Sequence, residues 1–153
     1  MSIGSLRKIV DLIESTAVQY PQVKQFGSDF ESEMQNYLTN NEKWFSVFVA
    51  IPQETVMTVK ENVNTITVRV FCHGRIQNNR NNIVDIVSDS QLILSDLYRE
   101  LNELNEDFEL EGESNIVPVN NSLLDYLAGN YYELTFIVNP VNKCEIPKLE
   151  DYE

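Results

Sequence analysis

NIVDIVSDSQLILSDLYRELNEL, residues 82–104, is the stretch that decides the fold, because it is a long segment with a clear helical period. Asn81 or Asn82 is a suitable N-cap, and Asp85 lies near the positive end of the helix dipole. A helix with one apolar stripe, set between strand-like runs, needs a sheet to cover that stripe. The stripe recurs at steps of three and four residues and comprises Ile83, Ile86, Val87, Leu94, Leu97, Tyr98, Leu101 and Leu104.

Strand-like runs flank this helix on both sides in the sequence. They are rich in β-branched and aromatic residues and alternate in a way that is typical of strands with one buried face. The polar residues 61–64 predict a hairpin loop between the second run and the third. The runs are residues 44–51, 55–60, 65–76 and 131–138. The faces expected to be buried in the last two runs carry Ile66, Val68, Val70 and Cys72, and Tyr132, Leu134, Phe136 and Val138.

The N-terminal part contains a shorter helix and one ambiguous segment. The apolar spacing predicts a first helix over residues 5–15, and Pro21 ends any continuation of it. Gly27 followed by Ser28 is interpreted as a turn. Residues 30–38 fit a helix and a strand equally well, so periodicity leaves that segment open.

The C-terminal part is acidic and contains short strand signals. Phe108 and Leu110 are possible anchors of a short strand within the acidic residues 105–115. Residues 116–119 form another short strand signal, weakened by Pro118. Gly129 is expected to precede the last strand.

The order of helix, strands, long helix and strands predicts an α+β fold. We expect a mainly antiparallel sheet, with the long helix and the N-terminal helix packed on one face. At 153 residues the chain suits a single domain with a real core. Residues 1–148 are assigned to that domain, and residues 149–153 to an acidic tail that need not fold.

The charge of the chain is strongly acidic, with 24 Asp and Glu residues against 11 Lys and Arg and a formal net charge of −13. Ordinary nucleic-acid binding needs a basic surface to neutralise phosphates, so this charge argues against it. The charge favours solubility, or a surface that lies close to DNA without binding it. No apolar run approaches the roughly 20 residues that span a bilayer, and no signal peptide is visible at the N-terminus.

The sequence contains few groups that could form a catalytic or metal site. His73 is the only histidine and stands beside Cys72. Neighbouring residues on a strand point to opposite faces, so these two are not expected to form a thiolate–imidazole pair. His73 is interpreted as a strand-end residue near a turn at Gly74, and a reduced state is favoured for Cys72 and Cys144. Residues 107–112 begin like a calcium loop, but Pro118 stands where its glutamate belongs. No enzyme activity, metal or cofactor is predicted.

Three stretches resemble a known family. The first is YPQVKQFG at residues 20–27, and the second is DIVSDSQLILSDL at residues 85–97. The third begins with LAGNY at residues 127–131 and ends with NKCEIP at residues 142–147. Their order and spacing resemble the small neck and tail-terminator (tail completion) proteins of tailed bacteriophages, especially the versions in phages of Bacteroides-like hosts. The sequence departs from the family pattern at Tyr20 and Asn130, where histidine and tryptophan are usual.

The resemblance implies a tail-terminator-like fold and a structural virion protein. Such subunits form a homo-oligomeric ring at the head–tail junction or the tail end, around the DNA channel. The implied partners are further copies of the chain and the portal, adaptor or tail proteins of the same virion. Genomic DNA would pass through without specific binding, no membrane is involved, and assembly takes place in the cytoplasm of the bacterial host. The neck or the tail of the virion is the implied location.

Contact surfaces for such a ring are expected in polar and acidic loops. The candidate residues are Gly27, Ser28, Asp29, Gln77, Asn78, Asn79, Arg80, Glu109, Glu111 and Glu113. Two alternatives remain open at this point. One is an acidic DNA mimic or regulatory binding protein of a phage, which the net charge also suits. The other is a small hydrolase that uses Cys72 or a pair of carboxylates.

Overall fold

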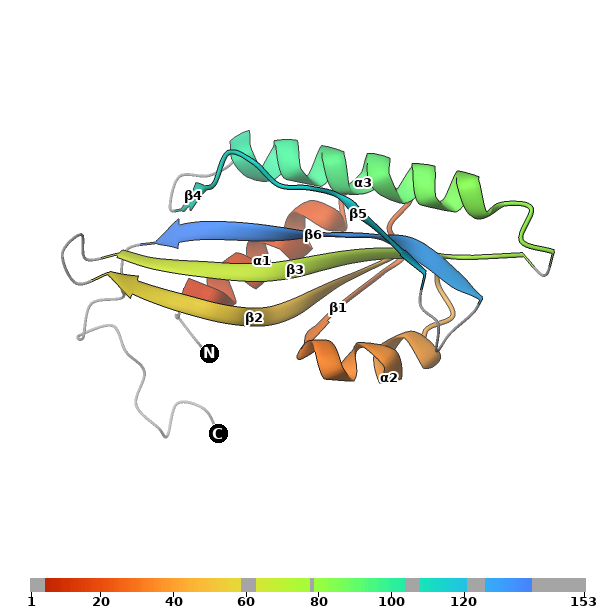
Figure 1. The fold of residues 1–153 in the computed structure, drawn as a ribbon, viewed down its shortest axis with the longest axis horizontal. Coiled ribbons are helices and arrows are strands. Elements are labelled where there is room, and N and C mark those ends of the chain that lie inside the picture. Colours follow the sequence, from red (N-terminus) through yellow and green to blue (C-terminus); the bar gives the residue numbers. More distant parts are fainter. Residues whose placement is uncertain (1–4, 59–62, 78, 104–107, 121–125, 139–153) are drawn as a thin grey trace.

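The computed structural model describes residues 5–58, 63–77, 79–103, 108–120 and 126–138. Within these residues the chain forms helices on both faces of one twisted sheet (Figure 1). The elements in chain order are α1 (Ser5–Ala17), β1 (Gln25–Asp29), the 3-10 helix η1 (Glu31–Glu33), α2 (Met34–Thr39), β2 (Ser46–Thr58), β3 (Val63–Arg75), α3 (Ile83–Glu103), β4 (Glu109–Leu110), β5 (Val117–Asn120) and β6 (Leu127–Val138). No helix among these residues is long and apolar enough to cross a membrane.

The sheet has six strands in the order β1-β2-β3-β6-β4, and β5 also pairs with β6. β2 and β3 form an antiparallel hairpin that runs from the pair Ser46 and His73 to the pair Thr58 and Val63. β6 lies antiparallel to β3 and to the short strands β4 and β5, whereas β1 runs parallel to β2. The predicted α+β domain with a mainly antiparallel sheet is therefore confirmed, with one parallel pair added at its edge.

The main core lies between the sheet and a layer formed by α1 and α3. The alternating residues predicted to face inward on β3 and β6 do so, and each is at most 4% exposed. α1 contributes Ile9, Val10 and Ile13 to the same core. On the other face, α2 covers a smaller cluster built on Phe48 and Phe71 through Met34 and Tyr37. Only the part of this second face near α2 is covered in this way (Figure 1).

α3 confirms the predicted long helix with small differences. Its inward face contains Ile93 and Ser90 in addition to the predicted leucines, because these positions complete the turn between Ile86 and Leu97. The Asn82 carbonyl oxygen accepts the hydrogen bond of the Ile86 amide, as an N-cap should. The Asn82 side chain instead closes the preceding loop, with Oδ1 accepting from the Gln77 amide at 2.8 Å. On the solvent side of the helix, Arg99 forms an ion pair with Asp96, three residues before it, at 2.7 Å.

Three glycines that suggested turns lie inside strands. Gly27 is in β1 and Gly129 is in β6, so the turn at Gly27-Ser28 and the strand start after Gly129 were wrong. A Cβ at Gly27 would lie 2.4 Å from the ring of Tyr37, and one at Gly129 would lie 1.8 Å from the Cys72 carbonyl oxygen. Gly74 likewise continues β3. These glycines give neighbouring groups room to approach the backbone.

β2 is one strand where the sequence suggested two. It continues through Pro52, and its pairing register with β3 shifts between Ala50 and Glu54. Such a bulge accommodates a residue that cannot take part in regular pairing. The ambiguous residues 30–38 form η1 and the start of α2, while the short strand signals correspond to β4 and β5.

Candidate functional site

Cys72 and His73 lie on opposite faces of the sheet, as their adjacency on a strand predicted. Cys72 is completely buried in the main core, and burial raises the pKa of its thiol. His73 is completely buried on the other face, where its ring stacks on Phe71 at a centroid distance of 5.9 Å. Burial lowers the pKa of His73 to about 4. A buried thiol of raised pKa is a poor nucleophile, so this pair offers no activated sulfur.

The surroundings of His73 differ from the strand-end position that was expected. β3 continues past it to Arg75, so no turn follows at Gly74. Both ring nitrogens are shielded from solvent, and neither has a hydrogen-bond partner among the described residues. The neutral form is therefore the one that this environment tolerates.

A second buried polar group, Asn130, has a structural role. It stands at the position where the resembling family usually has tryptophan. Its amide nitrogen donates to the Val87 carbonyl oxygen at 2.8 Å and to the Ser90 hydroxyl. These bonds attach the beginning of β6 to the first half of α3. Cys72 is a free thiol, and Cys144 lies outside the described residues. No group of three His, Cys, Asp or Glu residues that could hold a metal occurs in the described part of the chain.

The candidate contact residues that precede α3 in the sequence occupy two separate places. Residues 27–29 form most of the edge strand β1, and Ser28 and Asp29 are exposed. Gln77, Asn79 and Arg80 are exposed in the loop between β3 and α3, and Asn78 lies outside the described residues. Arg80 adopts a left-handed backbone with φ of 56°, and its amide donates to the Gln77 carbonyl oxygen at 2.8 Å. This hydrogen bond brings Gln77 and Arg80 close together.

The acidic candidates lie at the other end of α3. Glu109 belongs to β4, and Glu111 and Glu113 follow it on an exposed segment along β6. The Glu111 amide donates to the Thr135 carbonyl oxygen at 2.9 Å, and the Tyr98 hydroxyl donates to the Glu111 carbonyl oxygen at 2.7 Å. A helix of 21 residues is about 30 Å long, so this segment and the loop before α3 are widely separated (Figure 1). The sequence candidates therefore do not form one site.

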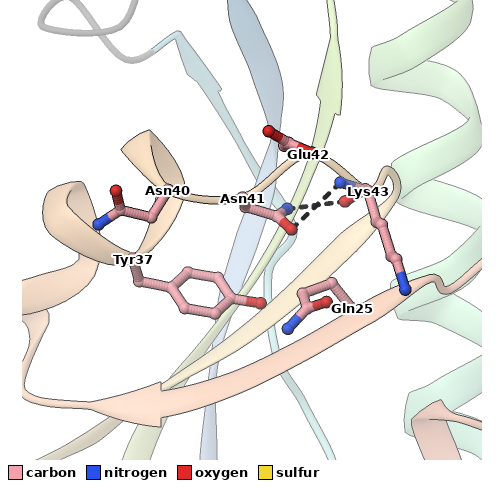
Figure 2. Close-up of a pocket in the computed structure, with 6 residues that line it drawn as sticks. All are labelled: Gln25, Tyr37, Asn40, Asn41, Glu42 and Lys43. Carbon is pink, nitrogen blue, oxygen red and sulfur yellow. Dashed lines mark hydrogen bonds between the residues drawn. The ribbon is translucent and has the colours of Figure 1, made fainter.

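An open polar hollow lies between α2 and the beginning of β1, with a volume of about 380 Å³. The Tyr37 hydroxyl is hydrogen-bonded to the Ser46 hydroxyl at 2.8 Å, and burial raises the pKa of Tyr37. Asn41 and Lys43 close their own loop through two hydrogen bonds, which Figure 2 shows. Because the Tyr37 hydroxyl and the Asn41 and Lys43 groups are already hydrogen-bonded within the chain, the hollow is better suited to polar contact with another molecule than to catalysis. Its lining residues are Gln25, Tyr37, Asn40, Asn41, Glu42 and Lys43.

The end of β2 forms a surface that the sequence analysis missed. We call residues 54–58 the β2 arm. β1 pairs with β2 only from Ser46 to Ala50, so the arm has β3 on one side and no described strand on the other. Its side chains Val56 and Met57 are 49% and 77% exposed. The signal of this surface in the sequence is the uncharged run from Thr55 to Thr58 in an acidic chain. The same run fits an ordinary hairpin strand.

The opposite edge of the sheet is protected differently. β5 carries Pro118, which has no amide hydrogen to offer to another strand, and β4 has only two residues. Natural edge strands are commonly shielded by proline, by charge or by being short. The β2 arm has a charge only at Glu54, so its described edge is open to pairing.

α3 carries an acidic stripe on its solvent side. The spacings of four, seven, four and three residues place five carboxylates on one side of the helix. Arg99 is the one basic residue in the helix, and it binds Asp96. The stripe comprises Asp85, Asp89, Asp96, Glu100 and Glu103.

No protein-family model matches the chain, and a search of curated proteins found no match.

Proposed function

We propose that the chain is a structural subunit of a homo-oligomeric ring in the neck or tail of a tailed-phage virion. The ring surrounds the DNA channel and joins neighbouring components of the virion. The ordered motifs that resemble neck and tail-terminator proteins motivate the proposal. The β2 arm is the structural observation that carries it.

The β2 arm is suited to association because its outer edge pairs with no described strand and it carries exposed apolar side chains. A strand edge without a partner can pair with a segment of another chain. Val56 points to the partly uncovered sheet face, since it stands opposite Thr65, whose neighbours along that face are Thr67 and Thr135. Burying these side chains removes apolar area from water at about 25 cal/mol per Å². If this arm contacts a different patch on the next copy, the same contact can repeat from copy to copy. It produces a closed ring when the rotations between neighbouring copies add up to a full turn.

The acidic stripe on α3 fits the passage of DNA. Carboxylates close to DNA repel its phosphates within about 10 Å at ordinary salt, so they prevent tight binding. A ring that places acidic surface toward its channel would allow the duplex to slide. The net charge of −13 supports this role but does not carry it alone.

The proposal is tested first by locating the protein and then by changing the arm. Reconstruction of virions is expected to place it in a closed ring around the channel, and its absence from virions would end the proposal. In solution, the mass of the purified protein is expected to be a multiple of 17.7 kDa. Val56→Lys is expected to shift that mass toward 17.7 kDa, while the control Val18→Lys, at a site 54% exposed, leaves it unchanged.

An acidic DNA mimic or regulatory binding protein is the second candidate, and the charge of −13 favours it. It predicts capture of a DNA-binding protein of the host and no association with virions. Recovery of such a partner, with release by added DNA, would favour this candidate over the ring.

A further inference from the structure

An apolar groove lies on the first half of α3, on the side away from the acidic stripe. Its volume is about 290 Å³, and no charged side chain lines it. Val84 is 75% exposed there and is the most exposed apolar side chain on α3, ahead of Leu92 at 60%. The lining residues are Ile83, Val84, Val87, Ser88 and Gln91.

Met57 on the β2 arm is the most exposed large apolar side chain among the described residues. It stands opposite Asn64, so it lies on the same side of the sheet as Ile66, which the helices cover. The end of β2 extends beyond α1 and α3 (Figure 1), and the 77% exposure of Met57 shows that no described helix covers it. Met57 therefore lies on the core side of the sheet, at a position that the described helices do not reach.

The groove belongs to the first half of α3, and Met57 lies near the end of β2. These parts of the two elements are at opposite ends of the molecule, so one copy cannot join them (Figure 1). Each copy has a net charge of −13, and copies therefore repel one another over most of their surface. The run from Thr55 to Thr58 is uncharged, and so is the groove. Contact between these two patches brings copies together where repulsion is smallest.

We propose that Met57 of one copy docks in the α3 groove of a second copy. The inference rests on the proposed self-assembly and names the two surfaces that meet. The neighbouring α3 then covers Met57 as the copy's own helices cover Val47 and Val49. An unbranched thioether side chain adapts well to an irregular groove. Because the two patches differ, the contact is heterologous. An open chain of copies therefore keeps a free arm at one end and a free groove at the other until the ring closes.

Matched substitutions on both surfaces test this contact. Met57→Lys and Val84→Lys each place a charge in the buried contact, and each is expected to reduce the assembly to 17.7 kDa monomers in mass photometry or native mass spectrometry. Leu92→Lys is the control on the same helix, since Leu92 is 60% exposed and does not line the groove. It is expected to keep the wild-type mass. All three sites are exposed, and circular dichroism checks that each variant folds.

Mixing the two monomeric variants gives the sharper result. Met57→Lys retains an intact groove, and Val84→Lys retains an intact arm. Their mixture is therefore expected to form a 1:1 heterodimer through one surviving contact, of twice 17.7 kDa. A mixture that stays monomeric overturns the proposal. It is equally overturned if Val84→Lys assembles as Leu92→Lys does, or if the wild-type chain is a monomer at its highest soluble concentration.

These outcomes separate the docking contact from the ring proposal. If the protein forms a ring in virions while Val84→Lys assembles normally, the docking contact is wrong and the ring stands. If the mixed variants form the heterodimer but virions lack the protein, the contact stands and the virion role fails.

Discussion

The buried imidazole of His73 makes a quantitative prediction about acid stability. In the folded chain both of its nitrogens lack partners, and burial lowers its pKa from 6.5 to about 4. Unfolding exposes the ring and restores the ordinary pKa. Below pH 6.5 the unfolded chain therefore binds a proton at His73 that the folded chain does not bind. The contribution of His73 to the free energy of unfolding is thus unaffected by pH above 6.5, and the free energy falls as the pH drops from 6.5 to 4. Linkage between the two pKa values gives a loss of about 2 kcal/mol at pH 5 relative to pH 8.

The measurement is urea unfolding of the wild-type chain and of His73→Leu at pH 8, 6 and 5. Leucine removes the titrating group and the two unpaired nitrogens but retains an apolar side chain of similar size. Carboxylates titrate in both proteins, so their contribution cancels in the difference. The free energy of unfolding of the wild-type chain is expected to fall by about 2 kcal/mol more than that of the variant between pH 8 and pH 5.

Parallel pH profiles for the two proteins would refute the reasoning, because they would mean that His73 binds its proton equally well in both states. His73→Gln provides a second comparison, since it is polar but does not titrate in this range. It is expected to be less stable than His73→Leu at every pH, because a buried amide without partners costs about 1–3 kcal/mol.

Two further predictions concern the core. Gly129→Ala places a Cβ 1.8 Å from the Cys72 carbonyl oxygen, so we expect about 3 kcal/mol or more of destabilisation, measured by urea unfolding. Gly112→Ala, which meets nothing within 4 Å, is the control and should change stability by less than about 0.5 kcal/mol. In a Cys144→Ser background, the thiol of Cys72 should react with a disulfide reagent in denaturant but far more slowly in native buffer, because burial raises its pKa and blocks access. Rapid reaction of the native protein would contradict its buried position.

Periodic patterns in the sequence predicted the parts of the fold that are set locally. The stripe of α3 and the alternation on β3 and β6 could be recognised because side-chain direction repeats at 3.6 residues in a helix and at two in a strand. Glycines were misread because a local rule treats them as turn residues. Gly27 and Gly129 instead make room for Tyr37 and for the backbone at Cys72, and such contacts are between residues distant in the sequence.

The candidate surface was harder to predict for the same reason. Whether a strand is an edge depends on the strand beside it, and the parallel pairing of β1 with only part of β2 leaves no local signal. Polarity correctly identified exposed residues such as Gln77 and Glu111. It could not show that they lie at opposite ends of α3, or that the uncharged run from Thr55 to Thr58 forms the open edge.

The bulge in β2 divides the strand into two parts that are paired differently. Up to Ala50 the strand pairs with both β1 and β3, whereas from Glu54 it pairs with β3 alone among the described strands. A bulge bends its strand, so this joint sets the direction in which the β2 arm leaves the packed part of the sheet. In the proposed ring, that direction would set the angle at which neighbouring copies meet, and therefore the curvature of the assembly.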